Sequence, residues 1–106
     1  MLHPAFTDCP GHEIWKRDFT GSASLFSVVF RADVGDAAVA CFVDALQLFK
    51  IGFSWGGVTS LVMGYPPIHR TGCDYGRRLV RLNIGLEDPA DLLADIEQAL
   101  AAMTGA

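Results

Sequence analysis

Residues 78–84 have the sequence RLVRLNI, and the alternation in this stretch decides how the rest of the chain can fold. Successive side chains of a β-strand point to opposite faces of a sheet. One face therefore carries the aliphatic side chains of Val80, Leu82 and Ile84. Arg81 and Asn83 belong to the opposite face, together with Leu79. The pattern predicts a strand whose apolar face packs against helices, while Arg81 and Asn83 point away from those helices.

Two stretches have the apolar periodicity of helices that could cover this strand. The first begins at Gly35-Asp36 and keeps its helical spacing to about Phe49. The second is expected after Asp88, a good N-cap, with Pro89 at the first helical position. The expected buried stripes are Val39, Phe42, Val43, Leu46 and Phe49 in the first helix, and Leu92, Leu93, Ile96, Ala99, Leu100 and Met103 in the second.

The remaining segments complete a small two-layer domain. The run Leu25 to Phe30 is apolar at every position but one, which predicts a central strand. Further strands are predicted at 51–53 and 58–63, and residues 13–19 can form a short helical turn. We therefore predict a single domain over residues 1–106 of the α+β class, with a small, largely antiparallel sheet and two long helices packed on it.

The composition restricts the classes of function. The chain has 106 residues, of which 51% are hydrophobic and only 19% charged. This hydrophobic fraction is high for a small monomer, so we expect some apolar surface to contact another domain, a partner chain or a second copy. The net charge of −4, without a basic run, argues against a nucleic-acid-binding scaffold. No stretch reaches the ~20 apolar residues of a membrane-spanning helix.

Cysteine usage and the first residues indicate a cytoplasmic protein. Cys9, Cys41 and Cys73 are an odd number at wide spacing, which is typical of free thiols in a reducing compartment. The N-terminus lacks the basic start and apolar stretch of a secretory signal.

A zinc site is an alternative role for two of these cysteines. Cys9-x-x-His12 and His69-x-x-x-Cys73 have the spacing of two ligand pairs. Zinc-organised chains are usually poor in core residues, whereas this chain is rich in them. The composition therefore favours polar loop histidines and free cysteines over a metal site.

Residues 52–57, GFSWGG, are too apolar for an ordinary surface loop and too rich in glycine for a strand interior. Ser54 offers a hydroxyl, Trp55 a planar ring with one N–H, and Arg81 a fixed fork of donors that suits a carboxylate. We predict that these residues form one wall of a site for a small anionic ligand. From residue type alone, Trp55 is more often a core aromatic and Arg81 more often a solvated or ion-paired surface group.

The same residues carry a resemblance to a known family. Residues 49–61, FKIGFSWGGVTSL, and 79–88, LVRLNIGLED, are similar to the C-terminal domain of the Cys/Met-metabolism enzymes that use pyridoxal phosphate. Residues 11–19, GHEIWKRDF, resemble the segment just upstream in that family. The Ser-Trp-Gly-Gly form at 54–57 most resembles the cystathionine β-lyases among these enzymes.

The resemblance implies roles for three residues. Arg81 would grip the α-carboxylate of an amino-acid substrate, and Ser54 and Trp55 would line the same pocket. The complete enzyme would use pyridoxal phosphate in a β-elimination that converts cystathionine to homocysteine, pyruvate and ammonia. The resemblance also implies that the fold is that of the C-terminal domain of fold-type I pyridoxal-phosphate enzymes.

The resemblance also implies what this chain does not hold. The family's Schiff-base lysine and its other cofactor-binding groups lie in a larger upstream domain, and nothing in this sequence matches them. We therefore expect no catalytic, cofactor-binding or metal-binding residue here, and no lyase activity from the chain alone. A missing large domain or a same-family subunit would complete the site, and we expect self-association.

A function of another class remains open at this point. The chain could be a truncated, non-catalytic binding or self-association module whose apolar surface contacts a partner. Nucleophilic catalysis within the chain has little support, because Ser54 and Ser60 lack a recognisable triad context. Lys16 and Lys50 lie in a charged segment and at a helix end, so neither has the surroundings of a Schiff-base lysine.

Overall fold

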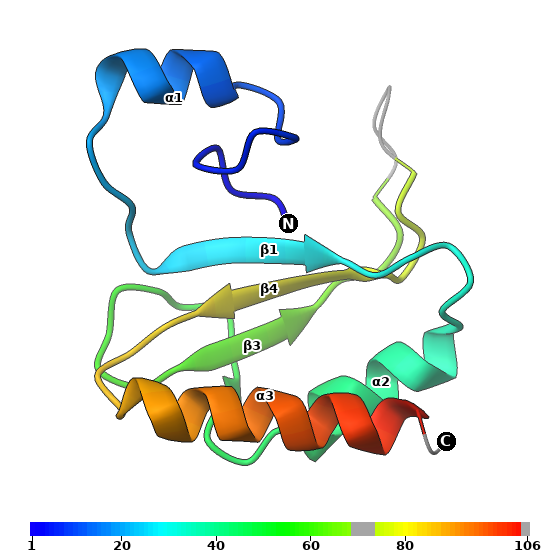
Figure 1. Cartoon of the computed structure of the whole chain (residues 1–106). Helices are drawn as coiled ribbons and strands as arrows, with labels where there is room; N and C mark the ends of the chain where they lie inside the picture. Colours follow the sequence, from blue (N-terminus) through cyan, green and yellow to red (C-terminus); the bar gives the residue numbers. More distant parts are fainter. Residues whose placement is uncertain (69–73, 105–106) are drawn as a thin grey trace.

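The structure is a computed structural model that describes residues 1–68 and 74–104. Within these residues four strands form one sheet in the order β1-β4-β3-β2 (Figure 1). They are β1 (Leu25–Val29), β2 (Lys50–Ile51), β3 (Leu61–Gly64) and β4 (Leu79–Asn83). β4 runs antiparallel to both β1 and β3, whereas β2 is parallel to β3. The predicted α+β class with a largely antiparallel sheet is confirmed.

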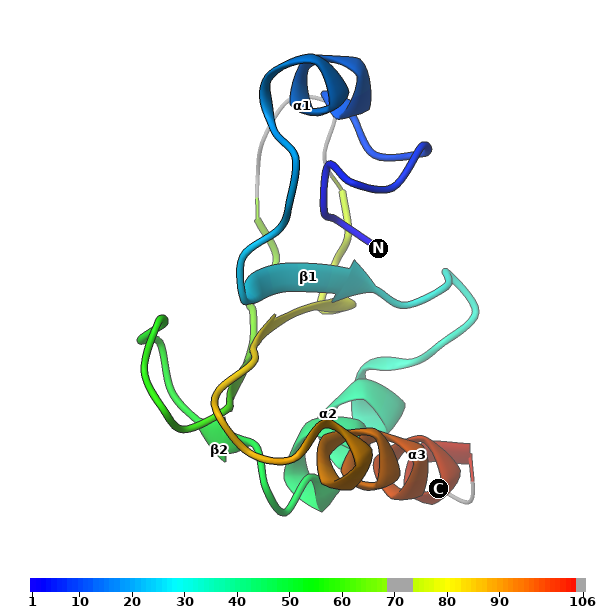
Figure 2. The ribbon, with the colours of Figure 1, turned by 60° about the vertical axis from the view of Figure 1, so that its left-hand side comes forward.

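Three helices accompany the sheet in the described part of the chain, α1 (His12–Asp18), α2 (Asp36–Ala45) and α3 (Pro89–Thr104). None of these helices is long and apolar enough to cross a membrane. α2 and α3 lie side by side on one face of the sheet, and α1 lies beyond β1, away from both (Figures 1 and 2). The short helical turn predicted near residues 13–19 is confirmed as α1.

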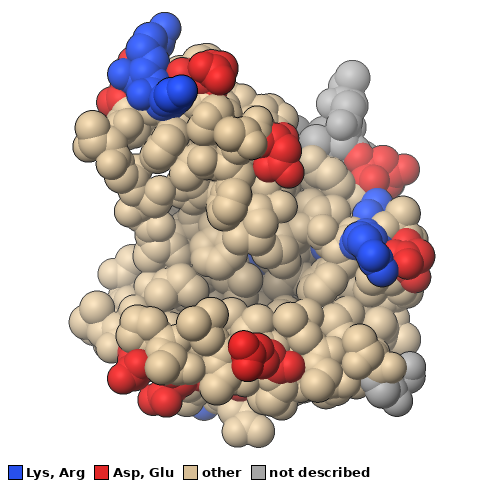
Figure 3. Space-filling model, in the orientation of Figure 1, with Lys and Arg blue, Asp and Glu red and all other residues tan. Residues whose placement is uncertain are grey.

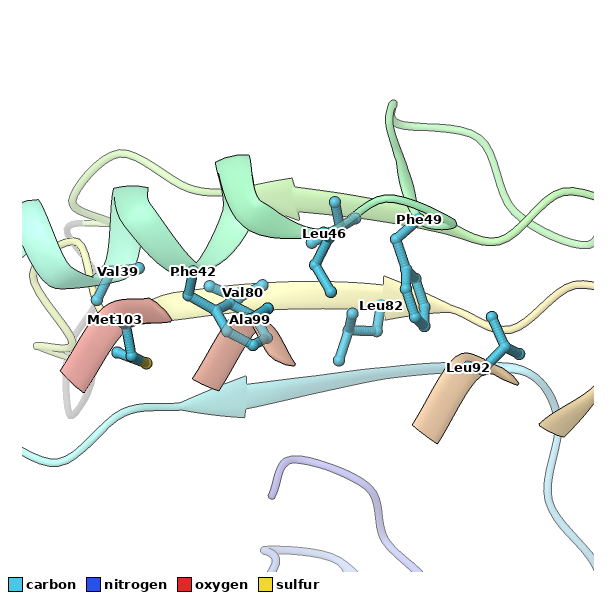
Figure 4. Packing of buried hydrophobic residues seen from close by; sticks show 10 residues of the cluster. Val39, Phe42, Leu46, Phe49, Val80, Leu82, Leu92, Ala99 and Met103 are labelled. Carbon is cyan, nitrogen blue, oxygen red and sulfur yellow. The ribbon is translucent and has the colours of Figure 1, made fainter. Parts of the chain in front are cut away.

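The core lies where α2 and α3 meet the sheet. Val80 and Leu82 of β4 are 0% and 3% exposed, as the alternation predicts. Figure 4 shows them beneath Phe42 and Phe49 and beside Ala99 of α3. Burying a large aliphatic or aromatic side chain stabilises a fold by roughly 1.5–3 kcal/mol relative to leaving it exposed. This packing fixes the orientation of β4, so Arg81 lies on the face opposite α2 and α3.

β1 is an edge strand, so the prediction of a central position was wrong. In the described sheet it has one full strand neighbour, β4. Its outer edge is partly covered by the N-terminal segment, where the N–H of Leu2 donates to the carbonyl of Ser27 at 2.7 Å. Every residue of β1 is only half-buried. The apolar run reflected cover from the N-terminal segment as well as from the sheet.

α2 ends at Ala45, whereas the sequence predicts a helix to about Phe49. Leu46 already has an extended backbone, with φ −64° and ψ 132°. The carboxylate of Asp95 on α3 accepts hydrogen bonds from the N–H groups of Gln47 and Leu48, at 2.9 and 2.8 Å. A residue nearly fifty positions away therefore stabilises the non-helical conformation. Phe49 is still buried, but it reaches the core from the segment that follows the helix.

α3 begins as predicted, but its buried stripe differs. Asp88 accepts a hydrogen bond from the N–H of Ala90 at 2.8 Å, and Pro89 is the first helical residue. Leu93 and Leu100 are exposed in the structure rather than buried. Asp95 occupies a buried position instead, at 6% exposure. The stripe is shifted because α3 presents Asp95 to the segment after α2.

The strand limits also differ by a few residues from the prediction. The strand predicted at 58–63 begins later, as β3 at Leu61–Gly64. The short strand predicted at 51–53 begins and ends earlier, as β2 at Lys50–Ile51. Residues 58–60 instead belong to the loop that leads into β3. This loop begins near Gly52 and includes the GFSWGG motif.

Candidate anion-binding site

Arg81 lies near the middle of β4, on the face of the sheet opposite α2 and α3. Its partners across the two neighbouring strands are Ser27 on β1 and Met63 on β3. The Arg81 side chain is half-buried. In the parts of the chain that the structure describes, no acidic side chain forms an ion pair with it, although Arg17, Arg31 and Arg77 each have one. The guanidinium charge of Arg81 is therefore available to an anion from outside.

Two aromatic rings flank this guanidinium. The Cζ atom of Arg81 lies 5.9 Å from the centroid of the Trp55 ring and 6.0 Å from that of the Tyr65 ring. Such contacts stabilise a cation by roughly 0.5–1 kcal/mol at exposed sites. These rings orient the planar guanidinium but leave its positive charge in place, whereas a carboxylate partner would neutralise it. The predicted proximity of Trp55 and Arg81 is present, and Trp55 is 64% exposed, so it does not belong to the core of this domain.

Tyr65 was not identified from the sequence. It directly follows β3, and its N–H donates to the carbonyl of Leu79 at 3.1 Å, which continues the pairing with β4. Met63 lies opposite Arg81, so the residue two positions later lies on the same face. The alternation of β3 could have revealed Tyr65. Phe53 completes the aromatic group, with its ring 6.4 Å from that of Tyr65 in an edge-to-face arrangement.

The GFSWGG loop is held beside Arg81 by hydrogen bonds at several points. The Nη2 group of Arg81 donates to the carbonyl of Phe53. The N–H of Gly56 donates to Oδ1 of Asn83 at 3.1 Å. Gly56 has φ +75°, a conformation that glycine adopts at little cost. Ser54 lies between these points and is exposed, without a hydrogen bond to Arg81 in the described structure. Its hydroxyl can therefore face a ligand.

A second group of contacts fixes the end of the loop. The buried Ser60 donates to the Glu87 carboxylate through its N–H at 2.9 Å and its hydroxyl at 2.7 Å. These two donors lower the pKa of the Glu87 carboxyl below its ordinary value. Gly85 approaches so closely that a Cβ atom there would lie 2.3 Å from the carbonyl oxygen of Val58. Ser60 is therefore a structural residue in this loop.

The zinc alternative gains no support from the described residues. His12 uses Nδ1 in a 2.7 Å hydrogen bond with the carbonyl of Pro4 and stacks on Trp15. His69 and Cys73 lie outside the described residues. Within residues 1–68 and 74–104, no three metal-ligating side chains come together.

Comparison with known proteins identifies the family. Residues 1–101 match the family model described as Cys/Met metabolism PLP-dependent enzyme. The chain belongs to this family. The chain is 42% identical over 105 residues to cystathionine β-lyase MetC of Escherichia coli (strain K12), and 46% identical over 104 residues to cystathionine β-lyase of Bordetella avium. The alignments cover 93% and 94% of this chain, but only 27% and 26% of those proteins.

Solved structures show the same fold at similar coverage. The crystal structure of metB from Corynebacterium glutamicum superposes with a TM-score of 0.73 at 33% identity, over 92% of this chain and 26% of that one. The chain thus spans about a quarter of the length of the relatives it matches. An L-alanine/L-glutamate racemase of Wolbachia pipientis wMel is also 39% identical, over 95% of this chain and 26% of that protein. Similarity over this quarter therefore does not by itself fix the reaction.

The described residues do not fit pyridoxal phosphate as a complete site. An aldehyde cofactor requires a lysine amine held in a shielded pocket, and both Lys16 and Lys50 are exposed. Lys50 begins β2, and its Nζ donates to the carbonyl of Gln47 at 3.4 Å. The cluster formed by Arg81 and its aromatic neighbours fits a carboxylate instead.

Proposed function

We propose that this chain is the C-terminal, substrate-carboxylate-binding domain of a carbon–sulfur lyase of the cystathionine β-lyase type. In the complete enzyme the reaction would be the β-elimination of cystathionine to homocysteine, pyruvate and ammonia. The observation that carries the proposal is the state of Arg81, which is half-buried between two aromatic rings and has no acidic partner among the described residues. The names of the β-lyase relatives support the reaction type.

Each residue of the candidate site has a distinct proposed role. Arg81 binds the α-carboxylate through the donors that Phe53 does not use, because a guanidinium fork matches a carboxylate in geometry and charge. Trp55 and Tyr65 hold the guanidinium in place through cation–π contacts. Ser54 offers a hydroxyl donor to the same carboxylate. These residues bind and orient substrate, and bond cleavage is assigned to the rest of the protein.

Exposed apolar residues in and beside the GFSWGG loop support the proposal that another domain or subunit completes the site. Phe53 lies in the GFSWGG loop, Val58 directly follows it, and the N–H of Leu86 donates to the carbonyl of Val58 at 2.8 Å; all three are large apolar residues that are exposed. Isolated exposed apolar residues need no explanation, but a contiguous group marks an interaction surface. We assign this surface to a large cofactor-binding domain or a same-family subunit.

The reaction can be tested with a chimera in which this chain replaces the matching quarter of E. coli cystathionine β-lyase MetC. We expect the purified chimera to release thiol from cystathionine, and the isolated 106-residue chain to release none. Thiol release by the isolated chain would contradict the assignment of bond cleavage to other parts of the protein. A folded chimera that racemises alanine but releases no thiol would contradict the lyase assignment.

The apolar surface also favours a second candidate, a non-catalytic self-association module. The observation is the same group of exposed residues, which two copies of the chain could cover by contact with each other. A chimera that folds with its cofactor but has no activity, together with a stable oligomer of the isolated chain, would favour this candidate.

A further inference from the structure

Asn83 is a buried polar residue that the proposed chemistry does not use. It ends β4, two positions after Arg81 on the same face, and is 1% exposed. Its Oδ1 accepts hydrogen bonds from the hydroxyl of Ser24 at 2.9 Å and from the N–H of Gly56 at 3.1 Å. Its Nδ2 is buried without a hydrogen-bond partner in the described part of the chain.

The unpaired Nδ2 of Asn83 carries a cost in stability, so the two hydrogen bonds to Oδ1 are what this side chain contributes. A buried donor without a partner is destabilising, whereas an apolar side chain of similar shape avoids that cost. A leucine at position 83 would have nearly the same size and would remove the unpaired Nδ2, but it would also take away the oxygen that accepts from Ser24 and Gly56. The role of the Asn83 carboxamide therefore lies in the groups that its oxygen binds.

The oxygen of Asn83 holds the tip of the GFSWGG loop. Gly56 is exposed, and its φ of +75° turns the chain directly after Ser54 and Trp55. The loop is also held near its start, where Arg81 bonds the carbonyl of Phe53, and toward its end, where Leu86 bonds the carbonyl of Val58 and Ser60 bonds Glu87. The Gly56 bond is the tie next to Trp55, and it starts from the strand that carries Arg81. This bond therefore fixes the position of the loop tip relative to the Arg81 guanidinium.

We propose that Asn83 is a positioning residue for the anion-binding site. Its Oδ1 fixes Gly56, and thereby places Ser54 and Trp55 beside Arg81. The proposal deepens the proposed function and rests on it for the identity of the ligand, but the ordering of the loop can be measured without any ligand. Without the Asn83 oxygen, the N–H of Gly56 can turn to water, because that residue is already exposed.

Amide hydrogen exchange at Gly56 and the ¹⁹F NMR signal of 5-fluorotryptophan at position 55 test this role in the 106-residue chain. Asn83→Leu is expected to speed exchange at Gly56 about tenfold and to shift the Trp55 signal toward that of free tryptophan. Asn83→Asp keeps an acceptor oxygen and is expected to retain the protection. Ser24→Ala removes the other donor to Oδ1 and is the matched control, with no change expected at Gly56.

Asn83→Thr gives the same test if the leucine variant fails to fold, because its side chain is too short to reach Gly56 and suits a strand. Unchanged Gly56 exchange and an unchanged Trp55 signal in the folded Leu or Thr variant would overturn the inference. Acetate titration, followed at the Arg81 Nε–H, separates the two proposals. If wild-type chain ignores acetate while Gly56 still responds to Asn83→Leu, the positioning role stands and the proposed function loses support.

Discussion

Arg81 differs from Arg17, Arg31 and Arg77 because its described neighbours are aromatic rings rather than carboxylates. Arg17 bonds Asp18 at 2.8 Å, whereas the Arg81 guanidinium lies about 6 Å from two ring centroids. A carboxylate partner would neutralise the guanidinium and compete with a ligand. Ring faces hold it in place and leave its charge available. At the scale of single residues, this environment is what makes Arg81 a candidate carboxylate clamp.

The ring of Tyr65 should matter to this clamp more than its hydroxyl. In the chimera, Tyr65→Leu is expected to raise the KM for cystathionine about two- to fivefold, since a cation–π contact contributes roughly 0.5–1 kcal/mol. Tyr65→Phe keeps the ring and should leave KM nearly unchanged. Steady-state kinetics on the three proteins measures this. Equal losses in the Phe and Leu variants would show that the hydroxyl, rather than the ring, is the important group.

At the scale of elements, the sequence predicted what depends on local pattern. The alternation of β4 assigned Arg81 and Asn83 to one face, and Asp88-Pro89 marked the start of α3. The end of α2 could not be predicted, because it depends on Asp95 in a distant helix. Tyr65 was missed because it lies just after the predicted strand at 58–63, and the pairing of Met63 with Arg81, which places Tyr65 beside the site, is known only from the folded sheet.

Asp95 should be important for stability and should make it depend on pH. Burial alone would raise the pKa of this carboxyl, but the N–H groups of Gln47 and Leu48 and the amide of Gln98 together lower it below its usual value. Asp95→Asn replaces one acceptor oxygen by a donor that faces these N–H groups. We expect a loss of roughly 2 kcal/mol in unfolding free energy at pH 7, while Glu97→Gln, an exposed change on the same helix, should have little effect.

The sign of the pH effect follows from the lowered pKa. The Asp95 carboxylate contributes its full stability above its unfolded-state pKa, near 4. That contribution is lost as the pH falls through the lower pKa of the folded state. The difference between wild type and Asp95→Asn should therefore shrink below about pH 4. Urea titrations between pH 7 and pH 3 measure it, and a gap that stays constant over that range would contradict this role for Asp95.

At the scale of the whole molecule, apolar surface remains uncovered. Figure 3 shows charged side chains over α1, along α3 and at the right-hand edge, with an uncharged and hollowed area on the left and in the centre between α1 and α3. Met1, Phe6 and Phe26 help to line a hollow in the N-terminal part of this chain. Leu86, next to the GFSWGG loop, is 80% exposed. A chain that covers about a quarter of its relatives would expose such surface where the remainder of a longer protein could bind.

This surface predicts association of the isolated chain. Sedimentation velocity should show concentration-dependent oligomers at roughly micromolar concentrations, because interfaces of standard size give affinities from micromolar to tighter. Introducing charge with Val58→Lys and Leu86→Lys should shift the population toward monomer. Thr59→Lys, also exposed but polar, is the matched control. A wild-type chain that stays monomeric at all concentrations would show that the apolar surface does not drive self-association.

The most direct test of the account compares two arginines of this chain in the MetC chimera. Arg81→Ala is expected to raise the KM for cystathionine by about 10- to 100-fold, the loss of a charge-assisted hydrogen-bonded pair. Arg77→Ala removes an exposed arginine whose nearest acidic partner is Asp36 at 4.0 Å, and it should leave KM within about twofold of the parent chimera. Equal KM values for the Arg81 variant and the parent would contradict the assignment of Arg81 as the carboxylate clamp.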